Sequence, residues 1–348
     1  MPAPICLIVN PSAGGGRAAR LAPEFETRLR ACGLTVRTVH TRDLDHARAL
    51  AREAAERGET IASLSGDGLV GVLADTLRDG PDAVLAVLPG GRGNDLARVL
   101  EVPGDAAGAC EVLASGVARP LDLGLVESLD GAGTLEAPAD TPEGRHGAPA
   151  DPPAPNARAF VGIASVGFDS DANRIANEAP SWLGGLVYAY GALRALASWR
   201  PARFELELDT GERHSFSGYT VAAANSRAYG GGMYAAPEAM LDDGLLDVIA
   251  IEDVSRLRFL KGLPRVFKGT HVEMDTVRTF RCASVTISSD RPFEVYADGD
   301  PVGALPVRVS ALPGAVSVIT PAAGAAALGT PLRSSRSGSA ASVEPSGA

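Results

Sequence analysis

The sequence predicts two domains: a parallel α/β domain followed by a β-rich domain of the β-sandwich type. Before residue 122, a short apolar run, a glycine-rich turn and a helical pattern follow one another three times, which is typical of a parallel α/β domain. After residue 158 the pattern changes, and apolar and charged residues alternate along Phe204–Asp209 as in a half-exposed strand. At 348 residues the chain is long enough for two hydrophobic cores.

The composition excludes several classes of function. A net charge of −10 argues against a nucleic-acid-binding protein, which usually carries a basic face. The only lysines are Lys261 and Lys268, so the first half of the chain cannot contain a phosphate loop of the Walker type. The four cysteines form no CxxC pair, which argues against a structural zinc site. No signal peptide is recognised at residues 1–11, so we expect a cytoplasmic location.

The first strand is expected at Ile5–Val9, and it leads into the glycine turn of Asn10–Arg17. The helix after this turn is expected to reach Cys32, with Gly33 as its C-terminal cap. The elements that follow before the next glycine turn are a second strand and a second helix, at Leu34–Val39 and Asp45–Arg57.

The most informative stretch is Thr60–Leu77, TIASLSGDGLVGVLADTL. Its apolar start predicts a buried strand, and its apolar periodicity toward Leu77 predicts a helix. The glycine turn between them would present free backbone N–H groups at a helix N-terminus, an arrangement that binds phosphate. Asp67 lies in this turn, and a carboxylate beside a phosphate usually requires a cation between them. The alternative is a tight turn in which Asp67 caps the helix.

A third unit has its strand at Ala83–Leu88, its turn at Pro89–Asp95 and its helices at Leu96–Leu100 and Asp105–Ala114. All three glycine turns follow the carboxyl ends of strands. In parallel sheets that edge is where ligands bind, so the pattern favours a nucleotide site.

We place the first domain at residues 1–122 and the second at 123–320, and a last strand near 305–320 could return to the first domain. The Pro-, Gly- and Ala-rich stretch 127–156 and the tail 321–348 are expected to be disordered. Trp182–Trp199 is almost uncharged, but it is short for a membrane span and contains Arg194, so a buried or pocket-lining helix is the better interpretation. The further elements expected in the second domain are the strands Tyr219–Ala224, Leu245–Ile251, Ser284–Ser288, Phe293–Tyr296 and Val307–Ser310, and the helices Asp171–Glu178 and Ser255–Lys268.

Six short motifs, in order, resemble those of the diacylglycerol kinase catalytic-domain superfamily, which includes bacterial lipid kinases and sphingosine kinases and is distantly related to NAD kinases. The resemblance extends over nearly all of residues 5–320. The motifs are NPSAGGGR at 10–17, SGDG at 65–68, LPGGRGNDLA at 88–97, LDLG at 121–124, AN with GGGM at 224–233, and PEAMLDDGLLD at 237–247. Each motif is weak alone, but six in the family's order are specific.

The resemblance implies an NAD-kinase-like first domain and ATP-dependent phosphorylation of a lipid hydroxyl, by default that of diacylglycerol, with phosphatidic acid as the product for phospholipid biosynthesis. Phosphoryl transfer depends mainly on positioning and charge stabilisation. The positions that match the family's nucleotide-binding residues are Asn10, Pro11, Ser12, Gly14, Gly15, Gly16, Thr41, Ser65, Gly66, Asp67, Gly68, Gly71, Gly91, Arg92, Gly93 and Asn94.

The resemblance also implies two magnesium sites and a base. The catalytic Mg²⁺ would be held by Asp67, Asp95 and Asp122, partly through water. A structural Mg²⁺ would be bound by the Asp243 carboxylate and by two backbone carbonyls, those of Met240 and Leu245. Asp300 would accept the proton of the lipid hydroxyl. The alternatives are a helix N-cap for Asp95 and ordinary turn residues for Asp122, Asp243 and Asp300.

The chain departs from the family pattern at several positions. Leu69 and Arg92 stand where the family has threonine, Val72 replaces a glutamate, and Asp300 replaces a longer glutamate. These departures motivate a rival of another class, a nucleotide-binding regulator without turnover. The nearest enzymatic alternatives are a sphingoid-base or other lipid-alcohol kinase and a soluble kinase of the NAD-kinase type.

The partners implied are ATP and a lipid substrate at the membrane surface, with no nucleic acid and no transmembrane segment; a homodimer stays open. We therefore expect a cytoplasmic protein that is peripheral at the membrane. The basic, partly apolar stretch Arg256–Lys268 could contact an anionic lipid surface, and a solvated helix face is the alternative.

Overall fold

A computed structural model describes residues 3–78, 80, 82–129, 157–177 and 187–322. The first half contains four parallel strands in the order β4-β3-β1-β2. These strands are β1 (Ile5–Val9), β2 (Val36–His40), β3 (Thr60–Ser65) and β4 (Val84–Pro89), and the helices around them are α1 (Ala13–Ala31), α2 (Leu44–Glu56), α3 (Asp67–Leu77), α4 (Asp95–Val99) and α5 (Ala106–Ser115).

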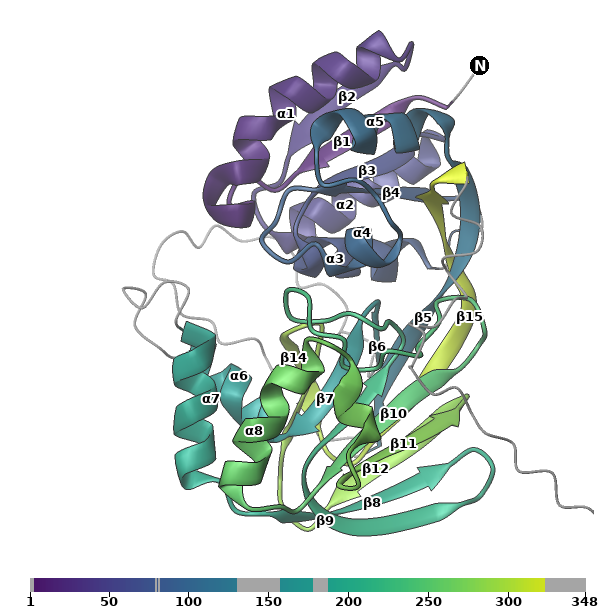
Figure 1. Cartoon of the computed structure of the whole chain (residues 1–348). Coiled ribbons are helices and arrows are strands. Elements are labelled where there is room, and N and C mark those ends of the chain that lie inside the picture. The colour runs from purple at the N-terminus through teal and green to yellow at the C-terminus, as the bar shows by residue number, and fades with distance from the viewer. Residues whose placement is uncertain (1–2, 79, 81, 130–156, 178–186, 323–348) are drawn as a thin grey trace, which may run out of the picture.

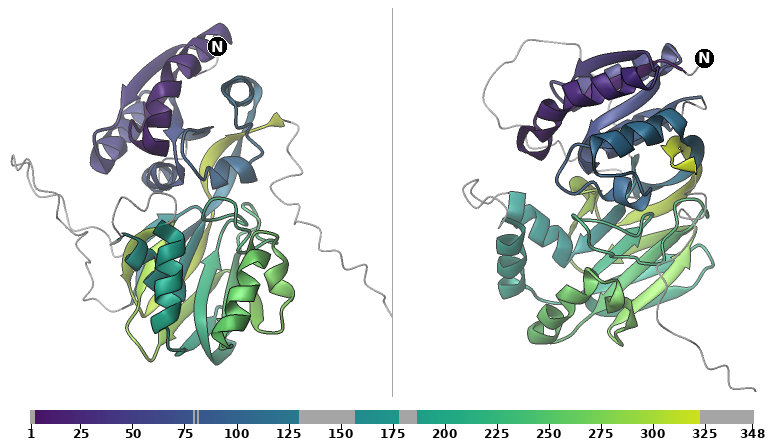
Figure 2. Two further views of the ribbon diagram at one scale, coloured as in Figure 1. Left: turned by 60° about the vertical axis from the view of Figure 1, so that its left-hand side comes forward. Right: turned by 45° about the horizontal axis from the view of Figure 1, so that its top comes forward.

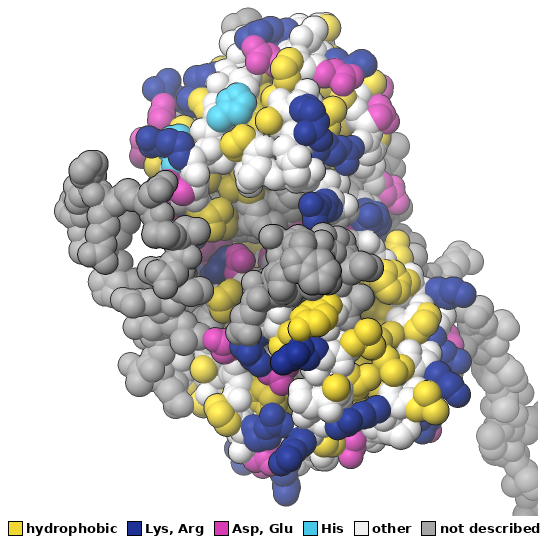
Figure 3. Space-filling view, turned by 90° about the vertical axis from the view of Figure 1, so that its left-hand side faces the viewer, with side chains coloured by type: hydrophobic (Ala, Val, Ile, Leu, Met, Phe, Trp, Pro, Cys, Tyr) yellow, Lys and Arg dark blue, Asp and Glu magenta, His cyan; other side chains and the backbone are white. Residues whose placement is uncertain are grey.

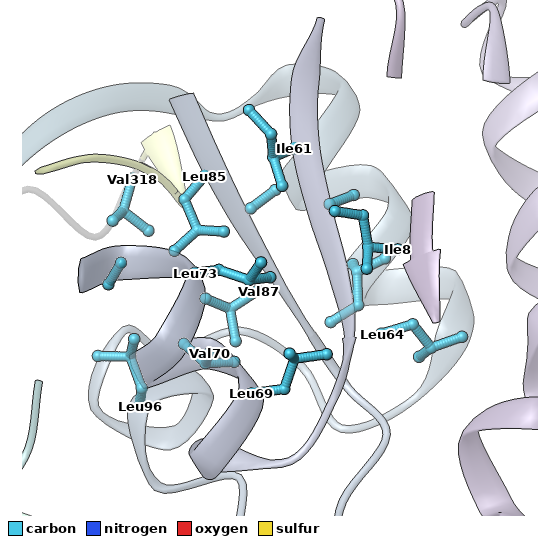
Figure 4. Close-up of a cluster of buried hydrophobic side chains, with 14 of the residues drawn as sticks. Ile8, Ile61, Leu64, Leu69, Val70, Leu73, Leu85, Val87, Leu96 and Val318 are labelled. Carbon is cyan, nitrogen blue, oxygen red and sulfur yellow. The ribbon is translucent and has the colours of Figure 1, made fainter. Parts of the chain in front are cut away.

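Helices cover both faces of this parallel sheet (Figure 1). α1 packs beside α5, and α2 packs beside α3. The right-handed crossovers expected of parallel strands place these two pairs on opposite faces. Because both faces are covered, β1, β3 and β4 are almost continuously buried, whereas the edge strand β2 is mostly half-buried. Figure 4 shows Leu69 and Leu73 of α3 within the same cluster as Leu85 of β4.

The second half is a mixed but mainly antiparallel arrangement with helices on one side (Figures 1 and 2). Its alternating strands bury one face; β8, for example, alternates strictly between buried and exposed residues. Its strands are β5 (Val117–Ser128), β6 (Ala157–Phe160), β7 (Ile163–Gly167), β8 (Ala202–Leu208), β9 (Arg213–Ala224), β10 (Leu246–Glu252), β11 (Val277–Cys282), β12 (Ser284–Ser289), β13 (Glu294–Ala297), β14 (Asp300–Ala304) and β15 (Val307–Thr320). Its helices are α6 (Phe168–Asn177), α7 (Val187–Ser198), α8 (Arg256–Val266) and a 3-10 turn at Thr270–Glu273.

Two long strands, β5 and β15, join the halves. β15 begins beside β12 in the second half and ends in parallel pairing with β4, where Ser317 lies opposite Val84. β5 pairs antiparallel with β15 along its length, with a register shift between Leu312 and Val316. The two halves are therefore parts of one hydrogen-bonded sheet.

The predicted fold class is confirmed: a parallel α/β region precedes a β-sandwich-like region. Several strands were not predicted, among them β5, β7, β11 and β14. β5 begins in Val-Ala-Arg-Pro, which has neither an apolar run nor an alternation, and its pairing comes from the distant β15. The stretch 130–156, the tail from residue 323 and the first part of the Trp182–Trp199 segment lie outside the described residues.

No helix within the described ranges is both long enough and apolar enough to cross a membrane.

Candidate active site

Three glycine turns meet at the carboxyl edge of the parallel sheet. β1, β3 and β4 are neighbours, so the turns that follow them are brought side by side. A Cβ atom on Gly14 would lie 2.7 Å from the carbonyl oxygen of Gly90, and one on Gly90 would lie 2.9 Å from the amide nitrogen of Ser65. Only glycine permits this approach of one backbone to another. The sheet order thus turns three separate sequence motifs into one surface.

The first turn has an unusual backbone. Gly14, Gly15 and Gly16 have φ angles of +60°, +66° and +83°, so three successive residues are left-handed before α1 becomes regular. Side-chain atoms of Asn10 hold the start of the turn, because its Oδ1 accepts hydrogen bonds from the amide and the hydroxyl of Ser12 at 3.1 and 2.8 Å. A side chain at the three glycine positions would be strained, so the turn depends on glycine.

Three arginines surround this turn. Arg17 donates to the carbonyl of Gly91 and Arg20 donates to that of Gly15, each at 3.4 Å. Arg92 reaches across from the third turn, with Nη2 3.8 Å from the position of a Cβ on Gly15. None of the three forms an ion pair with a carboxylate in the part of the chain that the structure describes. Guanidinium groups bind phosphate oxygens in bidentate fashion, so they can supply the positive charge that the absent lysine would give.

Asp67 and Asp95 converge beside Gly93. Oδ2 of Asp67 lies 2.7 Å, and Oδ2 of Asp95 3.5 Å, from the position that a Cβ on Gly93 would occupy. Asp67 accepts a hydrogen bond from the amide of Leu96 at 3.2 Å, and Asp95 accepts one from the amide of Gly231 at 2.7 Å. The second oxygen of Asp95 is paired with Arg98.

Burial, and after it the neighbouring charge of Asp95, raises the pKa of Asp67. Two carboxylates that repel one another in a partly buried site are relieved by a cation between them. The donor set is therefore one that fits Mg²⁺, which prefers one or two carboxylates and keeps several waters.

Asp122 is held by another set of partners. Its carboxylate oxygens accept hydrogen bonds from the amides of Gly244 and Gly314, at 2.6 and 2.7 Å. Its backbone carbonyl accepts from the side-chain amide of Asn225 at 2.9 Å. Asp122 thus ties β5 to the segment before β10 and to the bulge of β15, and no described contact joins it to Asp67 or Asp95.

The residues predicted for a structural Mg²⁺ lie in the same segment. The Asp243 carboxylate accepts a hydrogen bond from the amide of Leu245 at 2.9 Å and is paired with Arg281. Met240 is a half-buried neighbour in the run. Within the described ranges, no group of three or more His, Cys, Asp or Glu side chains is arranged to hold a metal ion. A site here would depend on backbone carbonyls and on release of Asp243 from Arg281.

Asp300, the predicted base, stands at the start of β14. Its carboxylate forms an ion pair with Arg158 at 2.9 Å, and its side chain is 46% exposed. Its neighbour Asp298 is a residue that the sequence reasoning missed. Asp298 has a φ of +50° in the turn between β13 and β14.

The carboxylate of Asp298 is enclosed by backbone. It accepts hydrogen bonds from the amides of Val161, Gly162 and Ile163 at 2.8, 2.8 and 3.1 Å. It also faces α3, with Oδ2 3.1 Å from the position of a Cβ on Gly71. Burial raises the pKa of Asp298 despite the three amides, and the charge of Asp67 adds to the rise. The Asp-Gly pair at 298–299 was the available signal, since this pair favours positive φ.

The remaining predicted residues frame the site. Thr41 is buried, with its hydroxyl donating to the carbonyl of Val9 at 3.4 Å. The hydroxyls of Ser65 and Ser63 lie 2.7 Å apart below the second turn. Asn94 is left-handed, and its Oδ1 accepts from the amide of Gly91 at 2.8 Å, which shapes the third turn. Gly68 is exposed, whereas Gly71 is buried against Asp298.

Comparisons with known proteins match both halves of the chain. A family model described as the diacylglycerol kinase catalytic domain matches residues 4–126, and one described as the YegS C-terminal NAD kinase beta sandwich-like domain matches residues 162–320. A diacylglycerol kinase of Mycobacterium tuberculosis is 32% identical over 320 residues, which cover 91% of this chain and 95% of that protein.

Two more distant relatives extend the comparison. A diacylglycerol kinase of Bacillus subtilis is 25% identical over 308 residues, which cover 86% of this chain and 90% of that protein. The crystal structure of a diacylglycerol kinase from Bacillus anthracis shares the fold, with a TM-score of 0.64 at 19% identity over 92% of this chain and 97% of that one.

Proposed function

The chain belongs to the diacylglycerol kinase family of lipid kinases, and from that membership we propose that it transfers the γ-phosphoryl group of ATP, with Mg²⁺, to the free hydroxyl of diacylglycerol to give phosphatidic acid. The observation that carries the proposal is the convergence of Asp67 and Asp95 at the point where the three glycine turns meet. Acidic side chains beside backbone that can approach a polyphosphate are the parts that phosphoryl transfer needs.

The nucleotide phosphates are assigned to the turn surface. In the turn of Asn10–Gly16, the position of a Cβ on Gly15 meets only Nη2 of Arg92, at 3.8 Å, so a phosphate oxygen could approach the backbone there beside the guanidinium. Asp67 and Asp95 would hold Mg²⁺, whose positive charge screens the phosphates during transfer. The remaining work of the protein is to position donor and acceptor in line.

We assign the proton of the acceptor hydroxyl to Asp300. The oxygen of that hydroxyl forms a bond to the γ-phosphorus, the bond to the ADP oxygen breaks, and the proton passes to the carboxylate. Asp300 is half exposed and can be reached by a substrate, whereas three amides enclose Asp298. Asp298 is assigned a positioning role, since it links the turn before Asp300 to Gly71 of α3.

The test is phosphate transfer from labelled ATP in mixed micelles with Mg²⁺. The acceptors are diacylglycerol, monoacylglycerol, sphingosine and ceramide, and the controls are Asp67→Asn and Asp300→Asn. We expect label in diacylglycerol that is lost in both variants. Label confined to sphingosine would move the acceptor to a sphingoid base, and label in a soluble acceptor that is not a lipid would overturn the proposal. ATP binding with no labelled product would indicate a regulator without turnover.

A further inference from the structure

α8 and the two residues after it concentrate positive charge in an acidic protein. Residues 256–268 contain five basic side chains and no acidic one, in a chain whose net charge is −10. Both lysines of the chain, Lys261 and Lys268, belong to this segment. A segment that opposes the charge of the whole molecule in this way is suited to an anionic surface.

The same segment leaves large apolar side chains in solvent. Leu257 is 64% exposed, Leu260 37% and Phe267 56%. Phe259, in contrast, is buried and stacks on Tyr219 with ring centroids 4.3 Å apart. The helix is therefore anchored to the β-rich half by one face, and its opposite face combines exposed leucine and phenylalanine with basic side chains, as in helices that lie on membranes.

The charges on this face are largely unneutralised. Arg258 is paired with Asp275, but Lys261, Arg265 and Lys268 form no ion pair with a carboxylate of the described ranges. A groove of about 470 Å³ lies beside the helix, and its charged lining comprises Arg258, Lys261 and Arg265 together with Glu273 and Asp275. Figure 3 shows hydrophobic and basic side chains intermixed over the β-rich half on this side of the molecule.

The helix α7 carries exposed side chains of the same kinds. The two helices are connected at one end, where Arg256 donates to the carbonyl of Trp199, just after α7, at 3.0 Å. On α7, Leu193 is 60% exposed and Arg194 is exposed beside it. Exposed apolar and basic residues therefore occur on both helices.

The end of α8 is also connected by hydrogen bonds to Asp95 of the candidate site. The amide of Tyr234 donates to the carbonyl of Val266, the last residue of α8, at 2.9 Å. Three residues before Tyr234, the amide of Gly231 donates to Asp95 at 2.7 Å. One short segment thus joins the end of the basic helix to a carboxylate of the site.

We propose that the exposed face of α8, made by Leu257, Leu260, Lys261, Arg265, Phe267 and Lys268, docks on the surface of a bilayer that contains anionic phospholipid. The inference deepens the proposed function and rests on it for its purpose, which is to present the site to a membrane-embedded acceptor. Charge complementarity selects this occupant, because the face offers unpaired cations together with apolar groups.

The test is co-sedimentation of the full chain with vesicles that contain neither acceptor lipid nor ATP. Vesicles of phosphatidylcholine are compared with vesicles of phosphatidylcholine and phosphatidylglycerol. Each basic residue near an anionic surface strengthens binding about fivefold, so Lys261→Ala/Arg265→Ala/Lys268→Ala should weaken binding to the anionic vesicles about 100-fold. Leu257→Ser/Phe267→Ser removes the apolar part without changing charge and should also weaken binding.

The matched control is Arg30→Ala/Arg52→Ala/Arg57→Ala, which removes the same charge from exposed positions of the α/β half and should leave binding unchanged. Equal weakening in the control, or no preference of the unmodified chain for anionic vesicles, would overturn the proposal. Transfer to a short-chain diacylglycerol in monomeric solution should be the same in all variants. Vesicle binding without any phosphate transfer would support the docking surface but overturn the proposed function.

Discussion

Asp67 is the first residue of α3, directly after β3, whereas Asp122 lies within β5, and the two carboxylates have different surroundings. Both oxygens of Asp122 accept short hydrogen bonds from backbone amides of two distant segments. Asp67 is brought next to a second carboxylate, and its pKa is raised by burial and by Asp95. The difference separates a carboxylate whose two oxygens are already used by backbone amides from one that lies beside a second carboxylate, and for this reason we propose Asp67 as the metal ligand.

The largest expected effect is on catalysis at Asp67. Asp67→Asn should lower kcat by about 1,000-fold, because it removes a charge from the proposed magnesium site. The measurement is labelled phosphate transfer into diacylglycerol at saturating ATP and Mg²⁺. A variant that keeps a tenth of the activity would show that Asp67 is not a ligand of the catalytic metal.

The same substitution should raise stability without metal at neutral pH. A folded-state pKa above the ordinary value means that the folded protein holds this proton more tightly than the unfolded chain. The ionised carboxylate therefore destabilises the fold above that raised pKa, and the penalty vanishes below the ordinary value of 3.8. Urea unfolding should show Asp67→Asn more stable than the unmodified chain near neutrality but not in acid, and Mg²⁺ should stabilise only the unmodified chain.

Asp122→Asn should lower the stability of the fold, whereas Asp67→Asn should raise it. The asparagine NH₂ group cannot accept a hydrogen bond from an amide, so one buried donor loses its partner, and about 2–3 kcal/mol of unfolding free energy should be lost. Asp45→Asn is the matched control, because that side chain is 82% exposed and the change should be nearly neutral. If Asp122→Asn abolished transfer while leaving the urea midpoint unchanged, Asp122 would belong to the metal site as the sequence suggested.

Substitutions of Arg92 test whether its guanidinium binds the phosphates of ATP. Arg92→Thr restores the residue that the family pattern has at this position, and we expect the KM for ATP to rise about tenfold with kcat retained. Arg92→Lys should recover only part of the loss, since an ammonium cannot bind two phosphate oxygens in the planar manner of a guanidinium. An unchanged KM in both variants would remove Arg92 from the phosphate site.

The sequence predicted the elements that neighbouring residues determine, and it missed the contacts between segments that are far apart in the chain. The three glycine turns and α3 were predicted because each combines an apolar run, glycines and a helical period within about 18 residues. The partners of Asp122 could not be predicted, because Gly244 and Gly314 come from segments more than 100 residues away. Asp298 was missed for the same reason, since the amides that enclose it belong to the connection between β6 and β7.

Asp247 offers a smaller test within the PEAMLDDGLLD run. Burial, and after it the charge of Glu238, raises the pKa of Asp247 from 3.8 to about 6. Arg281 lies 3.9 Å away and is shared with Asp243, so its charge does not offset the burial. The ionised side chain should therefore destabilise the fold above about pH 6, and this penalty should fade as the pH falls toward 3.8. Asp247→Asn should gain up to about 3 kcal/mol of unfolding free energy near pH 7 and almost nothing below about pH 3. A loss near pH 7, measured by urea unfolding, would show that the ionised carboxylate is stabilised in the folded protein, by Arg281 or by a bound cation.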